Sequence, residues 1–172
     1  SDIQQGEILT KKILKSSPKI AAVLACRNDS DRMYGKPLQK MGKFVILHHL
    51  INQIKTSKKI DEIVLAISEK PGNEIFIEFA KNENLKFVIG DDKDVLDRLI
   101  VGAKLVDAQI IFRVTSENPY IFWEGIDSII SKHVDEKFDF SFYDSLPIGS
   151  SYEIINLNSL EKSHKQGKDK HR

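Results

Sequence analysis

Residues 19–26 read Lys-Ile-Ala-Ala-Val-Leu-Ala-Cys, and residues 27–36 read Arg-Asn-Asp-Ser-Asp-Arg-Met-Tyr-Gly-Lys. The first stretch is an almost continuous apolar run, which is typical of a β-strand that is covered on both faces. The second stretch is a polar loop that contains a glycine. A buried strand that leads directly into such a loop predicts an α/β fold, with the loop at the carboxyl end of the first strand.

The rest of the chain alternates between strand-like and helix-like patterns. Further strand patterns lie at residues 61–68, 86–90, 109–114, 138–142 and 151–157. Helical spacing of apolar residues is found at about 44–54, 73–84, 91–103, 121–133 and 158–166. Strands that alternate with helices in this way predict a three-layer α/β/α domain with a mainly parallel sheet.

Two expectations concern the ends of these elements. Polar residues that can cap a helix through a side-chain oxygen stand where helices should begin: Asn73, Asp91 or Asp92, and Asn158. Ligands of parallel sheets bind beside the carboxyl ends of the strands. One crevice should therefore be surrounded by the loops that follow Cys26, Ala66, Gly90 and Val114.

The composition narrows the function classes. The chain has 172 residues and a formal net charge of +1, so we expect one domain with no general attraction to nucleic acid or to an anionic membrane. No apolar run approaches the roughly 20 residues that span a bilayer. No signal peptide is recognisable at the start, and Cys26 is the only cysteine. We expect a cytoplasmic protein, with an arm or linker at 1–18, a nucleotide-binding domain at 19–166 and a polar tail at 167–172.

The loop after the first strand carries the main chemical signal. Arg27, Arg32 and Lys36 place three cations within ten residues. Guanidinium groups can hold phosphate oxygens in a fork, and an ammonium can neutralise charge at a transferred phosphorus. Gly35 would let the backbone approach an anion closely. The alternative is a solvated loop whose cations pair with acidic residues of the same loop, and the loop does not have the P-loop pattern.

Several segments resemble, in order, a known family of nucleotidyltransferases. Residues 25–36 are similar to its pattern Ala-Arg-x-x-Ser-x-Arg-Leu-Pro-Gly-Lys, and residues 90–98 to Gly-x-x-x-Asp-Val-Leu-Asp-Arg. Residues 113–119 resemble Arg-Ile-Thr-Gly-Asp-x-Pro, and residues 146–149 read Leu-Pro-Ile-Gly, as in its Leu-Pro-x-Gly motif. This is the cytidylyltransferase family of the spore coat polysaccharide biosynthesis type, which also resembles CMP-KDO and acylneuraminate cytidylyltransferases. The match runs from about residue 19 to residue 162.

The resemblance implies a nucleotide-diphospho-sugar transferase (Rossmann-like) fold and a reaction. CTP and a sugar or sugar acid would give a CMP-sugar and pyrophosphate, with Mg²⁺, for the synthesis of a surface polysaccharide or glycan. Arg27 and Lys36 would be catalytic, and Glu117 would hold the metal. The nucleotide would be bound by Arg27, Ser30, Arg32, Gly35, Lys36, Asp97 and Arg98. The sugar would be bound by Arg113, Asn118 and Glu153.

Departures from the family pattern leave alternatives open. Ser116-Glu117 replaces the family's Gly-Asp, Tyr34 replaces a proline, and Ser150-Ser151 replaces Leu-Asp. These changes favour a second hypothesis, a catalytically impaired nucleotide- or sugar-binding module of a larger protein. An enzyme that uses another nucleotide is a third. Single residues could also have purely structural roles. Asp97 and Arg98 could form an ion pair on a helix surface, Arg113 could extend to solvent at a strand end, and Glu117 could belong to a turn.

The N-terminal residues give a further resemblance. Residues 2–10 read Asp-Ile-Gln-Gln-Gly-Glu-Ile-Leu-Thr, which is similar to a signature of the antifreeze-like domain that closes sialic-acid synthases. The alternative is a polar linker. If the resemblance holds, the chain is part of a multidomain protein that makes and then activates a nonulosonic acid. A homodimer is also left open, because the sequence does not specify an oligomeric state.

Overall fold

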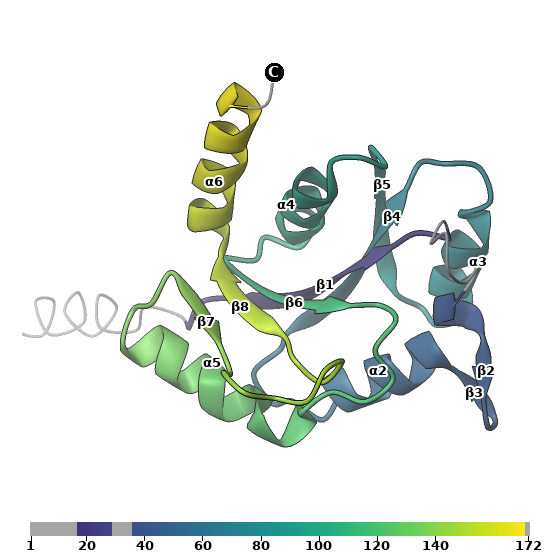
Figure 1. Cartoon of the computed structure of the whole chain (residues 1–172), viewed down its shortest axis with the longest axis horizontal. Helices are drawn as coiled ribbons and strands as arrows, with labels where there is room; N and C mark the ends of the chain where they lie inside the picture. The colour runs from purple at the N-terminus through teal and green to yellow at the C-terminus, as the bar shows by residue number, and fades with distance from the viewer. Residues whose placement is uncertain (1–16, 29–35, 171–172) are drawn as a thin grey trace, which may run out of the picture.

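The computed structural model describes residues 17–28 and 36–170. Its centre is a six-stranded sheet in the order β5-β4-β1-β6-β8-β7 (Figure 1). The strands are, in chain order, β1 (Ile20–Cys26), β4 (Glu62–Ser68), β5 (Lys86–Gly90), β6 (Ile110–Thr115), β7 (Phe140–Phe142) and β8 (Glu153–Asn156). The alternation seen in the sequence is therefore confirmed, strand by strand.

The first four strands of this order form the parallel part of the sheet. β1 pairs in parallel with β4 on one edge and with β6 on the other, and β4 pairs in parallel with β5. β8 is antiparallel to both β6 and β7. The parallel part brings the carboxyl ends of β1, β4, β5 and β6 to one edge of the sheet, which is the arrangement that the sequence predicted.

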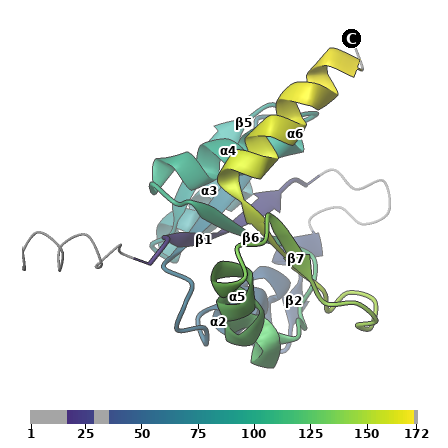
Figure 2. The ribbon, with the colours of Figure 1, turned by 90° about the vertical axis from the view of Figure 1, so that its left-hand side faces the viewer.

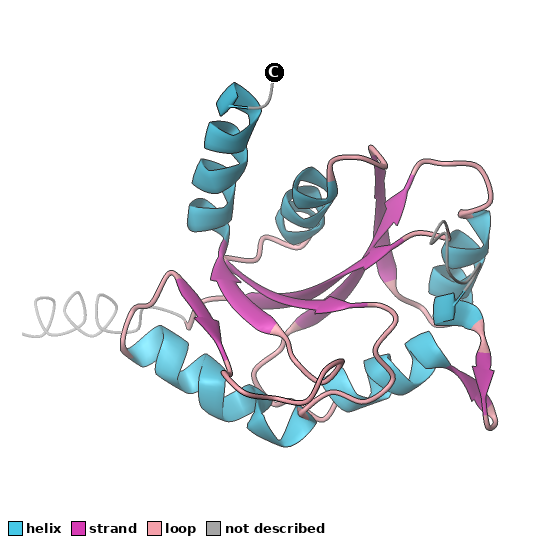
Figure 3. Ribbon diagram, in the orientation of Figure 1, coloured by secondary structure: helices cyan, strands magenta, loops and turns pink. Residues whose placement is uncertain are grey.

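Helices cover both faces of the sheet (Figures 1 and 3). One face packs against α2 (Ile46–Ile54), α3 (Glu74–Asn82) and α5 (Ile126–Asp135), and the other against α4 (Val95–Leu105) and α6 (Leu157–Lys170). Alternate residues of β1 face the two layers: Ala22 and Leu24 belong to the first core, and Ala21 and Val23 to the second. In the described ranges, no helix is long and apolar enough to cross a bilayer.

A small hairpin replaces the start of one predicted helix. Residues 44–54 were expected to be helical, but β3 (Phe44–Val45) pairs antiparallel with β2 (Lys40–Met41), and α2 begins only at Ile46. Gly42 turns the chain between the two strands with a φ of 68°, a conformation that glycine adopts without strain. Two-residue strands are too short to show a period of two in the sequence. A short 3₁₀ turn, η1 (Lys36–Leu38), precedes this hairpin.

The predicted helix caps are only partly correct. Asp94, and neither Asp91 nor Asp92, caps α4: its side chain accepts the backbone N–H of Asp97 at 3.0 Å. Asn73 occupies the position before α3, but its side chain makes no capping hydrogen bond. The last helix begins at residue 157, so the expected cap at 158 lies inside it, and the helix continues to residue 170 instead of ending near 166.

Cys26 ends the central strand in a fully buried position. Its side chain is 0% exposed, and the thiol lies 3.4 Å from the backbone oxygen of Leu24. Burial raises the pKa of the thiol to about 12, and hydrogen bonding with Ser116 and the charge of Arg98 offset this only in part. Because the thiolate is the nucleophile of cysteine chemistry, Cys26 is inert in the folded chain.

We therefore expect the native chain to be unreactive towards Ellman's reagent at pH 8. The same chain in urea should release one equivalent of thiolate chromophore, because an exposed cysteine has a pKa of about 8.5. Cys26 is the only thiol, so the absorbance reports this site alone. A fast reaction of the native chain would contradict the buried position of this thiol.

Two helical glycines should respond oppositely to alanine. A Cβ at Gly102 of α4 would lie 2.8 Å from Cγ1 of Val23, whereas one at Gly167 of α6 would meet no atom within 4 Å. Overpacking costs about 1–3 kcal/mol and exceeds the gain of about 1 kcal/mol in helix propensity. We expect Gly102→Ala to lower the free energy of unfolding by up to about 2 kcal/mol and Gly167→Ala to raise it slightly, by urea titration. A stabilising Gly102→Ala would contradict the close contact between α4 and β1.

Candidate active site

A cavity of about 260 Å³ lies at the carboxyl ends of β1 and β6, beside the start of α4. Its walls come from three parts of the chain that are far apart in the sequence. The lining residues are Ala25 and Arg27; Val95, Arg98 and Leu99; and Arg113, Val114, Thr115, Ser116 and Glu117. Two of the four predicted loops, those after β1 and β6, therefore line this cavity, and its third wall is α4, which follows the loop after β5.

The cavity is strongly cationic. Arg27, Arg98 and Arg113 all line it, and Glu117 is the one carboxylate among its lining residues. Arg27 is exposed at the end of β1, and Arg113 is half-buried in β6. Three guanidinium groups around one small cavity suit an anionic ligand with several oxygens, because each guanidinium can donate two parallel hydrogen bonds.

Arg98 is the most unusual of these cations, because it is 1% exposed. Its Nη1 donates to the backbone oxygen of Asp91 at 3.2 Å, and its Nε is buried without a hydrogen-bond partner. Burial lowers the pKa of the guanidinium, and the nearby carboxylate of Asp92 offsets part of this effect. The hypothesis of a helix-surface ion pair between Asp97 and Arg98 is therefore wrong for the arginine.

The position of Arg98 depends on a glycine at the end of β5. A Cβ at Gly90 would lie 2.9 Å from Cγ of Arg98. The aliphatic part of the Arg98 side chain thus packs directly on the backbone at residue 90. A Cβ at this position would clash with it, so only glycine fits without a shift of the arginine. This close approach explains the glycine of the Gly-Asp-Asp-Lys-Asp-Val-Leu-Asp-Arg segment in physical terms.

Two pairs of predicted site residues are brought together. Lys36 Nζ lies 3.8 Å from Glu117 Oε2, so the expected phosphate lysine and the expected metal ligand are neighbours. Arg113 Nη1 lies 3.8 Å from Glu153 Oε2, because the two residues face each other across β6 and β8. All four side chains remain 37–40% exposed, so both pairs are open to exchange with a ligand.

The other predicted residues are placed less fully. Asn118 is half-buried in the turn after β6, and its Oδ1 lies 3.7 Å from the position of a Cβ at Gly149. The Leu-Pro-Ile-Gly segment therefore approaches the same turn. Asp97 is half-buried in the first turn of α4. Ser30, Arg32 and Gly35 lie outside the described residues, so their roles stay predictions.

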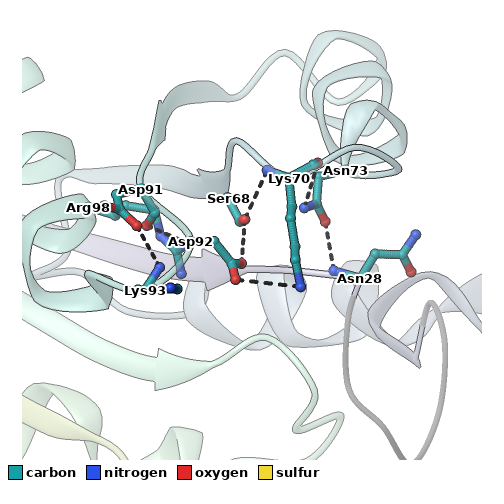
Figure 4. A network of polar contacts seen from close by, with 8 residues as sticks. All are labelled: Asn28, Ser68, Lys70, Asn73, Asp91, Asp92, Lys93 and Arg98. Carbon is teal, nitrogen blue, oxygen red and sulfur yellow. Dashed lines mark hydrogen bonds and ion pairs between the residues drawn. The ribbon is translucent and has the colours of Figure 1, made fainter.

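A polar network that the sequence did not predict joins the ends of β4 and β5 (Figure 4). Ser68, the last residue of β4, donates from Oγ to Asp92 Oδ1 at 2.6 Å, and its Oγ accepts the backbone N–H of Lys70 at 3.2 Å. Lys70 Nζ lies 3.8 Å from Asp92 Oδ2. The hydrogen bond from Ser68 is the main cause that lowers the pKa of Asp92, with smaller contributions from Lys70, Arg27 and Arg98.

The same network reaches the end of β1. Asn73 Oδ1 accepts the backbone N–H of Asn28 at 2.7 Å (Figure 4). Asn28 Nδ2 donates to the backbone oxygen of Gly72 at 2.9 Å. Asn73 Nδ2 in turn donates to the backbone oxygen of Lys70 at 3.0 Å. This is why Asn73 does not cap α3. Its sequence signal, an asparagine before a helix, is the same for both roles.

The implied Mg²⁺ would need carboxylate ligands near the cavity. Within residues 17–28 and 36–170, no three His, Cys, Asp or Glu side chains cluster in a way that could hold a metal ion. Mg²⁺ in nucleotide sites is commonly held by one or two carboxylates together with substrate phosphates and water. Glu117, a carboxylate at the edge of a cationic cavity, fits such a substrate-assisted site and not a site built from protein alone.

A larger cavity, of about 700 Å³, lies at the opposite edge of the sheet. It is lined by Pro18 before β1 and by Gln109 and Ile110 at the start of β6, so it faces the amino ends of these strands. His133, which is buried, contacts Ser141 Oγ at 2.7 Å and Asn156 Oδ1 at 2.8 Å there. Both ring nitrogens are thus used in joining α5, β7 and β8, which is a structural role.

The network at β4 and β5 makes a prediction about pH. The folded-state pKa of Asp92 is lowered, so its contribution to stability is present above the unfolded carboxyl value of about 4 and is lost as the pH falls through the folded value. Ser68→Ala should raise this pKa, as measured by NMR titration of the Asp92 carboxyl. The variant should be less stable than the native chain at pH 7, and the difference should shrink on acidification towards pH 3. A difference that stays constant over this range would contradict the proposed cause of the shift.

The chain matches the family model described as cytidylyltransferase over residues 21–171. It is 31% identical over 153 residues to the uncharacterized protein MJ1063 of Methanocaldococcus jannaschii, with 89% of this chain and 63% of that protein covered. It is 28% identical over 145 residues to the spore coat polysaccharide biosynthesis protein SpsF of Bacillus subtilis, covering 82% of this chain and 60% of SpsF. The chain thus spans less than two thirds of the length of both relatives.

Solved structures share the fold. A cytidylyltransferase from Leptospira borgpetersenii serovar Hardjo-bovis superposes with a TM-score of 0.78 at 24% identity, covering 85% of this chain and 63% of that one. CMP:2-keto-3-deoxy-manno-octonic acid synthetase in complex with CTP gives a TM-score of 0.68 at 14% identity, covering 86% and 78% of the two chains. The likeness to these structures shows the fold, and the family model, which spans almost all of the described residues, gives the classification: the chain belongs to the cytidylyltransferase family.

Proposed function

We propose that the chain transfers CMP from CTP to a sugar or sugar acid and releases pyrophosphate. The observation that carries this proposal is the cavity at the carboxyl ends of β1 and β6, with three arginines in its wall and Lys36 beside its carboxylate. A triphosphate is the kind of anion that such a set of donors suits. Membership of the cytidylyltransferase family supports CTP as its source.

The reaction needs little covalent chemistry from the protein. A hydroxyl oxygen of the sugar attacks the α-phosphorus of CTP in line, the bond from this phosphorus to the bridging oxygen breaks, and pyrophosphate leaves while the hydroxyl loses its proton. Positioning and neutralisation of charge supply most of the catalysis in such transfers. Arg27 and Lys36 would neutralise the triphosphate, and Arg98 would hold it from the side of α4. Ser30, Arg32, Gly35 and Asp97 complete the proposed nucleotide site.

Glu117 would hold Mg²⁺ together with the phosphates. When it is bound, the metal would withdraw charge from the phosphate oxygens and assist the departure of pyrophosphate. The distance of 3.8 Å from Lys36 Nζ to Glu117 Oε2 shows that lysine and carboxylate already share one location. Glu117 thus partly neutralises the lysine, and a bound phosphate would compete for this contact.

Arg113, Asn118 and Glu153 would bind the acceptor. An acidic sugar fits best, because its carboxylate could take the place of Glu153 beside Arg113 and receive both donors of the guanidinium. The short N-terminal resemblance to a sialic-acid synthase supports a nonulosonic acid as the acceptor. The likeness to SpsF supports a role in making a surface polysaccharide.

A second candidate function rests on one observation. Ser116, where the family has glycine, is 3% exposed, and Glu117 is directed towards a lysine. Glu117 stands where the family has aspartate, and its side chain is one methylene longer and paired with a cation. A metal held by this carboxylate would have to shift, which supports the alternative of a binding module without turnover.

The two candidates differ in turnover. We expect pyrophosphate release from the purified chain with Mg²⁺, CTP and an acidic sugar, and little with ATP, GTP or UTP. Lys36→Ala should lower kcat/KM by about 100-fold or more, the usual loss for one electrostatic donor. Lys81→Ala, a change in the last turn of α3 away from the cavity, should leave the rate unchanged.

Binding of CTP without pyrophosphate release from any nucleotide and sugar would favour the binding module. Turnover with a different nucleotide would keep the nucleotidyltransferase and reject CTP as its substrate. An equal loss of activity in Lys36→Ala and Lys81→Ala would remove Lys36 from the proposed site.

A further inference from the structure

The last helix, α6, packs on α4 through one face. Leu157, Leu160, Glu161 and His164 share this face, with the spacing of three, four and seven residues that aligns side chains along a helix. Leu160 is 6% exposed and belongs to the same core as Leu99 and Ala103 of α4. Figure 2 shows the two helices together on one side of the sheet.

Two polar side-chain contacts fix α6 at opposite ends of α4. Glu161 Oε1 lies 2.5 Å from Lys104 Nζ, near the last turn of α4. His164 Nε2 lies 2.9 Å from Asp94 Oδ1 and 2.8 Å from Asp94 Oδ2, before the first turn. Because a carboxylate only accepts hydrogen bonds, Nε2 carries the hydrogen, whether the ring is neutral or protonated. The His164 side chain is 14% exposed, and that of Asp94 is 26% exposed.

Asp94 is also the residue on which the first turn of α4 depends. Its Oδ1 accepts the backbone N–H of Asp97 at 3.0 Å, and its backbone oxygen accepts the backbone N–H of Arg98 at 3.2 Å. One residue therefore joins His164 to the helical turn that places Arg98 in the wall of the cavity. A change in the orientation of Asp94 would disturb the hydrogen bond to Asp97 and, through the backbone of this turn, the hydrogen bond to the N–H of Arg98.

We propose that His164 is a positioning residue for the nucleotide site: by holding the carboxylate of Asp94, it fixes the first turn of α4 and so the guanidinium of Arg98. The inference rests on the proposed function only for the identity of the ligand. It assigns a role to α6, a helix that contributes none of the residues lining the cavity.

The test compares His164→Ala with a matched control and a conservative replacement. Glu161→Gln breaks the ion pair with Lys104, the other polar contact between the same helices, without touching Asp94. His164→Gln keeps an N–H donor. Hydrogen exchange of the amides of residues 95–98 reports the first turn of α4 directly, and steady-state kinetics with CTP report the site.

We expect exchange in residues 95–98 to become about tenfold faster in His164→Ala, as loss of a hydrogen bond to a charged group implies. KM for CTP should rise about fivefold or more with kcat changed less than about twofold, because binding in the ground state and the transition state weakens equally. His164→Gln should restore most of both values. Glu161→Gln should change neither.

The proposal is overturned if His164→Ala leaves the exchange of residues 95–98 unchanged, or if Glu161→Gln accelerates it equally, since His164 would then only dock α6. Unchanged KM despite faster exchange would also overturn it.

If the native chain turns over no CTP, the proposed function fails, but the positioning role can still be tested. Binding of inorganic pyrophosphate then takes the place of KM for CTP, and it is measured by titration beside the same hydrogen exchange. Should His164→Ala not fold, Asp94→Asn serves instead: it keeps a capping oxygen and weakens the contact with His164, so both changes should recur in smaller size.

Discussion

The central strand β1 pairs with β4 along one edge and with β6 along the other, while helices cover both of its faces. Six of the seven side chains of this strand are buried, so a charged residue at any of these positions would lose its contact with water and counter-ions. The first polar residues after the strand, Arg27 and Asn28, therefore appear where the chain leaves the sheet. The strands on either side are also mostly apolar, and their charged residues, Glu62 of β4 and Arg113 of β6, are only half-buried. The loops after these strands therefore bring polar groups from distant parts of the sequence to one edge of the sheet. The cationic cavity follows from how the core is buried.

This constraint also explains how much the sequence could predict. Buried strands are recognisable as apolar runs, so the alternation of strands and helices was predicted correctly. The predicted crevice at their carboxyl ends was correct for the loops after β1 and β6. The contacts of Lys36 with Glu117 and of Arg113 with Glu153 bring together residues that the family resemblance assigns to the site, and their roles there stay predictions. The antiparallel addition of β8 and β7 was not predicted, because an apolar or alternating run does not reveal which neighbour it pairs with or in which direction.

Polar residues were harder to interpret, because one residue type serves several roles. Three aspartates stand within four positions before α4, and only the hydrogen bond to the N–H of Asp97 distinguishes Asp94 as the cap. Asn73 has the sequence signal of a cap but binds the backbone of Asn28 instead. Arg98 looks like a solvated helix residue, and only the packing of α4 on the sheet shows that it is buried. Such choices depend on distances between segments that are remote in the sequence.

The close approach of Arg98 to Gly90 has a consequence for how sequences of this family diverge. While the arginine is retained, position 90 is restricted to glycine, since any Cβ would lie 2.9 Å from the arginine stem. A lineage that loses the arginine removes this restriction, and position 90 is then free to accept a side chain. Positions 90 and 98 should therefore covary in an alignment of relatives. Homologues that have lost both would identify members in which this wall of the cavity is no longer under selection.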